Sequence, residues 1–90
     1  MKLVFSRAAV NDLARLREFI ARQYPDAAQR IAQRLRGAIQ GLVSTPQIGR
    51  PVADLSGEVR ELIFGKYVIR YKIKQPQLFI LRIWHGKEER

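Results

Sequence analysis

The sequence has no cysteine, one histidine and one tryptophan. The absence of cysteine excludes disulfides and thiolate metal sites, and a single histidine leaves too few ligands for the usual zinc sites. No apolar run is long enough to span a membrane, and the apolar start of the chain is too short for a signal peptide. These absences predict a cytoplasmic protein that uses no metal or other cofactor.

Acidic residues are scarce relative to basic ones. Seventeen Lys and Arg residues face eight Asp and Glu residues, which gives a formal net charge of +9. This excess favours an anionic partner: nucleic acid, an acidic protein or a membrane surface. The basic residues are spread along the chain, and most are arginine, whose forked guanidinium suits carboxylates and phosphates. Apolar residues make up 47% of the chain, so we expect a folded domain.

The first half of the chain has the period of helices. Residues 2–5 are a short strand candidate, and Ser6 is placed to cap the helix that follows. Pro25 ends this helix, whose apolar stripe is Val10, Leu13, Leu16, Ile20 and Tyr24. Asp26 and Gln29 are expected to form a capping box for a second amphipathic helix. The short connection predicts an antiparallel helical hairpin.

The second half of the chain alternates with a period of two. After a loop, the segments 59–64, 67–74 and 78–84 are predicted to be strands joined by tight turns. The last segment is apolar on both faces except for Arg82, which predicts a central strand covered on both sides. The order β-α-α-β-β-β predicts an α+β fold, with a helical hairpin packed on a mostly antiparallel four-stranded sheet and the whole of residues 1–90 in one domain.

Few residues are candidates for catalysis. The chain has no Gly-rich phosphate loop, and its serines (Ser6, Ser44 and Ser56) lack the context of a nucleophile elbow. His85 could act as a general acid or base, or be a strand-end side chain hydrogen-bonded to backbone, and the sequence leaves both open.

A basic set remains on and after the predicted sheet: Arg60, Arg70, Lys72, Lys74, Arg82, His85, Lys87 and Arg90. Such a sheet face could hold RNA phosphates or an acidic peptide. Arg82 interrupts an apolar strand, where a charge is costly unless paired, so a partner is implied. Whether Arg82 shares a face with Arg70 depends on a register that the sequence does not fix.

Several segments resemble the RelE/ParE superfamily of type II toxin–antitoxin toxins. They are residues 5–9 (FSRAA) with Asp12-Leu13, 46–51 (PQIGRP), 60–62 (REL), 65–71 (GKYVIRY) and 80–86 (ILRIWHG). In this order they span nearly the whole chain. The resemblance implies the same fold, and a toxin that is neutralised by a cognate antitoxin.

The superfamily has two activities, and one of them is cleavage of mRNA on the ribosome by RelE-like members. These use basic residues and a C-terminal tyrosine. Here Val68 and Glu88 stand where two of their arginines are, and the place of the tyrosine falls beyond Arg90. An acidic residue where a phosphate should be stabilised argues against cleavage. A ribonuclease here would instead rely on Arg82, His85 and Lys87.

ParE-like members resemble this chain better, and they inhibit DNA gyrase. The resemblance therefore implies a non-enzymatic toxin that binds gyrase and blocks replication. The expected target-binding residues are Arg70, Arg82, His85, Lys87 and Arg90. The implied partner is a ParD-like antitoxin whose acidic or amphipathic C-terminal segment wraps the toxin, with DNA bound only through the antitoxin complex and no membrane contact. An inactive homologue that still pairs with its antitoxin is the third alternative.

Overall fold

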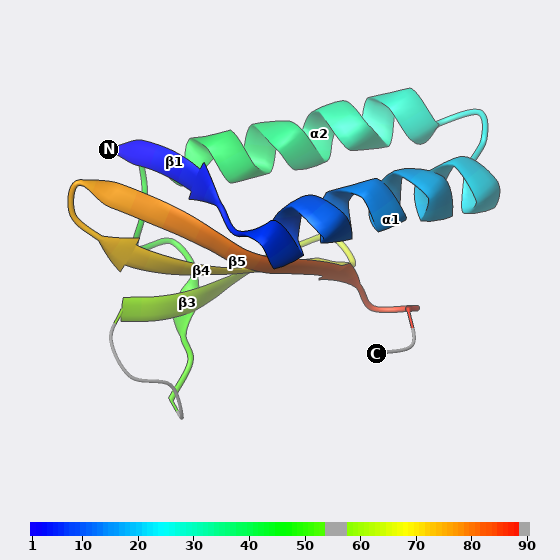
Figure 1. Ribbon diagram of the computed structural model, residues 1–90. Coiled ribbons are helices and arrows are strands. Elements are labelled where there is room, and N and C mark those ends of the chain that lie inside the picture. The colour runs from blue at the N-terminus through cyan, green and yellow to red at the C-terminus, as the bar shows by residue number, and fades with distance from the viewer. Residues whose placement is uncertain (54–57, 89–90) are drawn as a thin grey trace.

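The computed structural model describes residues 1–53 and 58–88 of the chain. Within them, one strand precedes two helices, and the remaining strands follow (Figure 1). The elements are β1 (Lys2–Phe5), α1 (Arg7–Gln23), α2 (Ala28–Gly41), β2 (Arg50–Pro51), β3 (Glu58–Phe64), β4 (Tyr67–Lys74) and β5 (Gln77–His85). The predicted α+β class and the helical hairpin are confirmed.

The strands form a five-stranded sheet in the order β1-β5-β4-β3-β2. β1 runs parallel to β5, and the other neighbouring strands are antiparallel. The sequence predicted four strands, and the additional one is β2, where Arg50 pairs with Glu61 and Pro51 with Arg60. Two residues are too few to show an alternating pattern, which is why the strand was missed. Its proline suits a sheet edge, where no further donor is needed.

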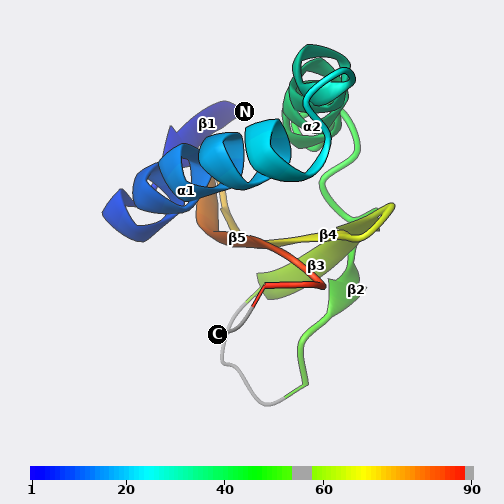
Figure 2. The ribbon, with the colours of Figure 1, turned by 90° about the vertical axis from the view of Figure 1, so that its right-hand side faces the viewer.

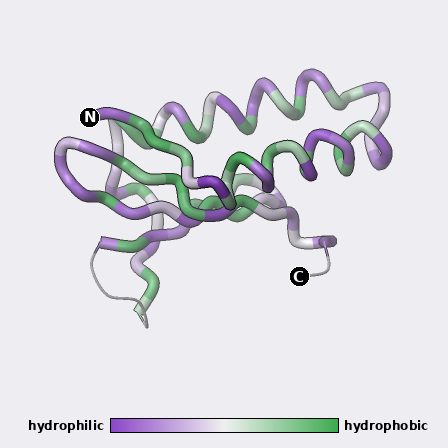
Figure 3. Tube along the Cα trace, viewed as in Figure 1, coloured by the Kyte–Doolittle hydropathy of each residue, from purple (hydrophilic) through white to green (hydrophobic). Residues whose placement is uncertain are grey.

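Both helices lie on one side of the sheet (Figures 1 and 2), and hydrophobic residues recur along each of them and along β5 (Figure 3). β5 lies between β1 and β4, as predicted for a central strand. The expectation that it is covered on both sides is wrong, because Phe79 and Trp84 on the face away from the helices are only half-buried. The core consists of Ala9, Leu16, Ile20, Leu35, Ile39, Leu42, Tyr67, Ile69, Tyr71, Leu78, Ile80 and Ile83.

The two helices begin differently. Ser6 caps α1 as predicted: its hydroxyl accepts a hydrogen bond from the Ala9 amide at 3.0 Å and donates one to the Leu81 carbonyl at 2.9 Å. The predicted capping box of α2 is wrong, because the N-cap is Ala27 and no side chain caps the helix. Asp26 lies one residue earlier, in the turn that the Ala27 amide closes on the Tyr24 carbonyl at 3.1 Å. The turn therefore takes up the residue that the pattern assigned to the cap.

A β-bulge in β5 decides which of its side chains face the helices. The register shifts between Arg70 and Tyr71 of β4: Tyr71 pairs with Ile80, but Arg70 pairs with Arg82, so Leu81 is the extra residue. An extra residue reverses the alternation along a strand. The helix-facing side chains of β5 are therefore Leu78, Ile80, Ile83 and His85, all of which are buried.

The loop before β2 is fastened to the sheet from the helix side. The Tyr71 hydroxyl donates to the Pro46 carbonyl at 2.6 Å and accepts from the Gly49 amide at 2.9 Å. Arg60 Nη1 donates to the Gly49 carbonyl at 2.7 Å. A Cβ at Gly49 would lie 2.6 Å from the Tyr71 hydroxyl oxygen and 2.8 Å from the Glu61 carbonyl oxygen, so only glycine fits this approach.

Candidate target-binding surface

Arg70 and Arg82 are cross-strand partners on β4 and β5. The register that the sequence left open thus places the two residues on the same face of the sheet. Their guanidinium groups nevertheless engage different partners, because Arg70 contacts β3 and β5 while Arg82 reaches α1. Of the basic set predicted from the sequence, the sheet register brings Arg70 and Arg82 together, whereas Arg60 lies on the helix side of the sheet and His85 is buried.

Arg70 is held over the open face of the sheet, the face that points away from the two helices. Its Nε and Nη2 donate to Glu61 Oε2 at 2.8 and 2.6 Å, and its guanidinium carbon lies 5.4 Å from the centre of the Trp84 ring. A cation over an indole contributes about 0.5–1 kcal/mol at an exposed site. Arg70 stays partly exposed in this arrangement. It therefore presents a guanidinium of fixed orientation on the open face.

Arg82 has the partner that its position in an apolar strand implied, and that partner is Asp12 of α1. Arg82 Nε and Nη2 donate to the two carboxylate oxygens at 2.9 and 3.1 Å, a bidentate pair. Arg15 Nη1 donates to the same carboxylate at 2.6 Å, and the Ile83 amide donates at 2.8 Å. Asp12 is only 2% exposed, so a single buried carboxylate holds two guanidinium groups and one strand amide.

The charge of Asp12 is secured by these donors. Burial alone would raise the pKa of its carboxyl, but hydrogen bonds from Arg82, Arg15 and the Ile83 amide outweigh burial and lower the pKa to about 2. The same contact raises the pKa of Arg82. Asp12 is therefore ionised at every physiological pH, and Arg82 is kept on it by charge as well as by geometry.

The tail after β5 is folded back onto the strand and onto α1. Arg15 Nε donates to Glu88 Oε2 at 2.6 Å, and Glu88 Oε1 accepts from the His85 amide at 2.9 Å. The Gly86 amide donates to the Lys66 carbonyl at 2.8 Å. The hydrogen bond from Arg15 is the main reason why the pKa of Glu88 is lowered. Glu88 is thus an ion-pair partner of α1, while the neighbouring Lys87 is exposed to solvent.

His85 lies in the core at 2% exposure, with its ring centre 5.0 Å from that of Phe19 and 4.8 Å from that of Tyr67. Its Nδ1 accepts the Lys87 amide at 2.9 Å, which requires that nitrogen to be unprotonated. Burial, and then the charge of Lys87, lower the pKa of His85. The imidazole is therefore neutral near pH 7. Of the two roles left open by the sequence, the strand-end role describes its contacts here, and a side chain this buried does not reach a partner directly.

Other candidates take structural roles or lie outside the described residues. Ser6 uses its hydroxyl in the cap of α1, and Ser44 is exposed on the turn after α2. Ser56 and Arg90 lie outside the described residues. In residues 1–53 and 58–88, no three His, Asp or Glu side chains gather closely enough to hold a metal ion.

Asp12, Arg15 and Glu61 organise this surface. The patterns of the sequence predict a role for none of the three, although Asp12 and Glu61 lie in segments that carry the family resemblance. The predicted apolar stripe of the first helix includes Val10, which is wrong: Val10 is 53% exposed, and Asp12 and Ala9 are buried instead. The usable signal was Arg82 itself, since an unpaired charge in an apolar strand requires an acidic residue elsewhere in the chain.

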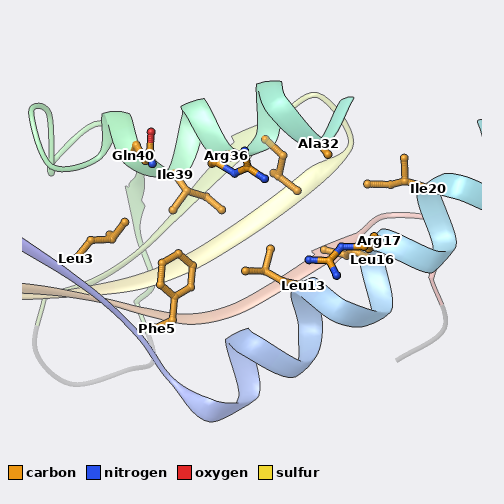
Figure 4. A pocket seen from close by; sticks show the side chains of 11 residues that line it. Leu3, Phe5, Leu13, Leu16, Arg17, Ile20, Ala32, Arg36, Ile39 and Gln40 are labelled. Atoms are coloured by element: carbon orange, nitrogen blue, oxygen red, sulfur yellow. The ribbon is translucent and has the colours of Figure 1, made fainter. Parts of the chain in front are cut away.

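A second feature is an apolar groove between the two helices, above β1. It has a volume of about 280 Å³, and Figure 4 shows its side chains converging from β1, α1 and α2. The guanidinium groups of Arg17 and Arg36 lie among them, one from each helix (Figure 4). The lining residues are Leu3, Phe5, Leu13, Leu16, Arg17, Ile20, Ala32, Leu35, Arg36, Ile39 and Gln40.

None of the helices in the described part of the chain is long and apolar enough to cross a membrane.

Known proteins share this arrangement over nearly its full length. The chain matches the family model described as "ParE toxin of type II toxin-antitoxin system, parDE" over residues 3–90. It is 34% identical over 90 residues to Toxin RelE1 of Caulobacter vibrioides, covering 98% of this chain and 96% of the relative. It is 36% identical over 86 residues to Toxin RelE2 of the same organism, covering 94% of each chain.

A solved structure of the chromosomal ParDE TA system from P. aeruginosa contains a similar chain, with a TM-score of 0.80, 25% identity and 97% of both chains covered. A helical hairpin on this mixed sheet is the arrangement of the small RelE/ParE toxins of type II toxin–antitoxin systems. Within that class, the chain belongs to the ParE toxin family. The family resemblance predicted from the sequence is thereby confirmed.

Proposed function

We propose that this toxin arrests growth in the cytoplasm by binding DNA gyrase, without chemistry of its own. The observation that carries the proposal is the state of the segment where ribonuclease relatives complete their site. His85 is buried and neutral, and its Nδ1 already accepts the Lys87 amide. Glu88, at the place of a phosphate-binding arginine, is bound to Arg15. Neither group is placed to move a proton or to stabilise a phosphate.

The surface offered to gyrase is basic and held in place. Arg70 lies over Trp84, Arg82 is about half exposed on its ion pair, and Lys87 projects from the folded-back tail. Side chains ordered before binding lose less entropy when a partner arrives. The charges suit an acidic patch on the target and would speed its encounter at low salt. His85 contributes by holding the tail.

A RelE-like ribonuclease is the second candidate, because the two curated relatives above carry RelE names at 34% and 36% identity. In that case Arg82, Lys87 and His85 would carry the reaction. His85 would then have to leave the contacts with Phe19 and Tyr67 that bury its ring. The cost of opening that part of the core makes this the weaker proposal.

Induced expression in bacteria separates the two candidates. Gyrase poisoning predicts induction of the DNA-damage response with intact mRNA, whereas a ribonuclease predicts rapid codon-linked mRNA cleavage without DNA damage. Lys87→Glu should weaken growth arrest about tenfold if the tail contacts the target through its charge. Lys74→Glu, an equal change on an exposed lysine at the other end of β4, is the matched control and should leave growth arrest intact. An equal loss of growth arrest in Lys87→Glu and Lys74→Glu would show that the tail is not part of the surface that binds the target.

For the antitoxin, we propose a ParD-like protein whose amphipathic C-terminal segment lies in the groove between α1 and α2. The groove is apolar and already open, which suits the apolar face of a helix. Arg17 and Arg36 beside it suit acidic residues on that segment, as does the net charge of +9. Operator DNA would be bound by the N-terminal domain of the antitoxin.

Charge reversal at the groove tests this partner. Arg17→Glu should weaken binding of the cognate antitoxin about tenfold while toxicity persists, because Arg17 lines the groove and is not one of the proposed target-binding residues. Arg22→Glu is the matched control, since Arg22 is exposed on the same helix but does not line the groove. Equal antitoxin affinity of wild type and both variants, measured by calorimetry, would place the antitoxin elsewhere.

A further inference from the structure

The outer edge of β5 has two halves. Its first half pairs with β1, from Lys2 opposite Gln77 to Phe5 opposite Ile80. β1 ends there, and among the described residues no strand continues the pairing. Backbone groups of the second half would be left without partners on that side, which is costly where water is excluded and invites pairing with foreign strands where it is not.

Side chains take the place of the missing strand. The Ser6 hydroxyl donates to the Leu81 carbonyl, Asp12 accepts the Ile83 amide, and Arg15 Nη2 donates to the Ile83 carbonyl at 3.1 Å. Glu88 accepts the His85 amide. The next backbone groups along this edge are therefore bonded in turn by α1 and the tail. We call Asp12, Arg15 and Glu88 the edge clasp.

We propose that the edge clasp positions the target-binding end of the toxin, with Asp12 and Arg15 as positioning residues that do not touch the target. This inference rests on the proposed function. Asp12 fixes the guanidinium of Arg82 through two hydrogen bonds, and Arg15 fixes the tail that carries Lys87 through Glu88. α1 thus sets where both charges stand.

The exposure of the edge clasp agrees with this role. Asp12 is buried, whereas the side chains of Arg15 and Arg82 are 44% and 43% exposed. An ion-pair network is no better for stability than a well-packed apolar contact of the same volume, but it fixes geometry through directional bonds. Here the buried carboxylate anchors charges whose outer atoms stay in contact with solvent, where a partner can meet them.

Asp12→Asn tests the proposal, with Glu18→Gln as the matched control on an exposed acid of the same helix. The amide keeps the size of Asp12 but has no charge and a single acceptor oxygen, so it cannot accept the four hydrogen bonds that Arg82, Arg15 and the Ile83 amide donate. We expect hydrogen exchange of the Ile83 amide to speed up about tenfold relative to that of Ile80, and half-maximal gyrase inhibition to need about tenfold more toxin. Antitoxin affinity should stay within about twofold, because Asp12 does not line the groove. Simple destabilisation would instead weaken both kinds of binding together.

Arg15→Lys is the milder second variant, which keeps the charge but cannot reach Asp12, Glu88 and the Ile83 carbonyl at once. Faster exchange at Ile83 with unchanged gyrase inhibition in either folded variant would overturn the proposal, as would a parallel loss of antitoxin affinity. Growth arrest is measured alongside. If wild type arrests growth without touching gyrase, the proposed target fails, and the split between growth arrest and antitoxin affinity still decides the role of the edge clasp. A wild-type chain that neither arrests growth nor inhibits gyrase would overturn both the proposed function and the proposed role of the edge clasp.

Discussion

The two sides of helix α1 face opposite kinds of environment. Toward α2 it presents Leu13, Leu16 and Ile20 to an apolar groove that is still open. Toward β5 it presents Asp12 and Arg15 to a polar edge whose hydrogen-bonding groups are partnered within the chain. The open side has space for a further segment, whereas on the closed side the edge of β5 is already bonded by side chains of α1 and the tail.

The contrast between an open apolar groove and a bonded polar edge indicates which surface suits which partner. An apolar groove gains free energy from an occupant that covers it, so the open side suits a partner that folds as it binds. On the closed side, the hydrogen bonds of the β5 edge are formed within the chain, and the charged side chains are held at fixed positions. We therefore propose that the antitoxin binds the open side and the target the closed side.

The largest effect is expected from breaking the closed side at Asp12. Asp12→Ala leaves Arg82, Arg15 and the Ile83 amide without their acceptor. The two arginine side chains are 43–44% exposed and can turn to water, so the loss of these hydrogen bonds and the unpaired Ile83 amide should together cost about 3 kcal/mol. Glu18→Ala, on the exposed face of the same helix, should change the free energy of unfolding by less than about 0.5 kcal/mol. Urea denaturation measures both. Equal small losses would mean that the closed side contributes no more than a solvated surface does.

A substitution at Gly49 tests how tightly the loop before β2 packs on the sheet. Gly49→Ala puts a methyl group against the Tyr71 hydroxyl and the Glu61 carbonyl, so we expect a loss of up to about 3 kcal/mol in the free energy of unfolding. Tyr71→Phe removes the oxygen that the new methyl group would contact most closely. The loss of stability in the double mutant should therefore be smaller than the sum of the losses in the two single mutants. Strict additivity in the double-mutant cycle would contradict this packing.

Acid should loosen the closed side in two stages. Because the pKa of His85 is lowered below 6.5, the unfolded chain takes up the proton first and stability begins to fall below that pH. The pKa of Asp12 is lowered from 3.8 to about 2, so its contribution is complete above pH 3.8 and is lost as the pH falls through 2. That second loss is about 2 kcal/mol. Denaturation of wild type and Asp12→Asn over a pH series checks it, since the share of the acid loss due to Asp12 should disappear in the variant while that of Glu88, whose pKa is also lowered, remains.

The smallest effect is expected in α2, the helix on the other side of the groove. Gly37 lies on the exposed face of α2, and a Cβ there would meet nothing within 4 Å. Gly37→Ala should therefore stabilise the fold by about 1 kcal/mol, seen as a higher thermal midpoint. A lower midpoint would show that the helix face is more constrained than its surroundings indicate.

The contrast between the two sides also explains what the sequence could predict. The open side follows from apolar periodicity in 7–23 and 28–41, which local patterns report well. The closed side depends on contacts such as Asp12 to Arg82, 70 residues apart. No local pattern encodes such a pair, and the bulge at Leu81 that sets the register of Arg82 leaves no mark in an apolar run. The charge of Arg82 in an apolar strand implies an ion-pair partner but does not identify it as Asp12.

Whether this toxin acts by binding or by cutting RNA is tested most directly with purified components. The toxin is added to DNA gyrase with plasmid and ATP, and in parallel to a translating ribosome extract with a defined mRNA. We predict loss of supercoiling with accumulation of gyrase-cleaved DNA, while the mRNA stays intact. Codon-linked cleavage of the mRNA with gyrase fully active would contradict the proposal.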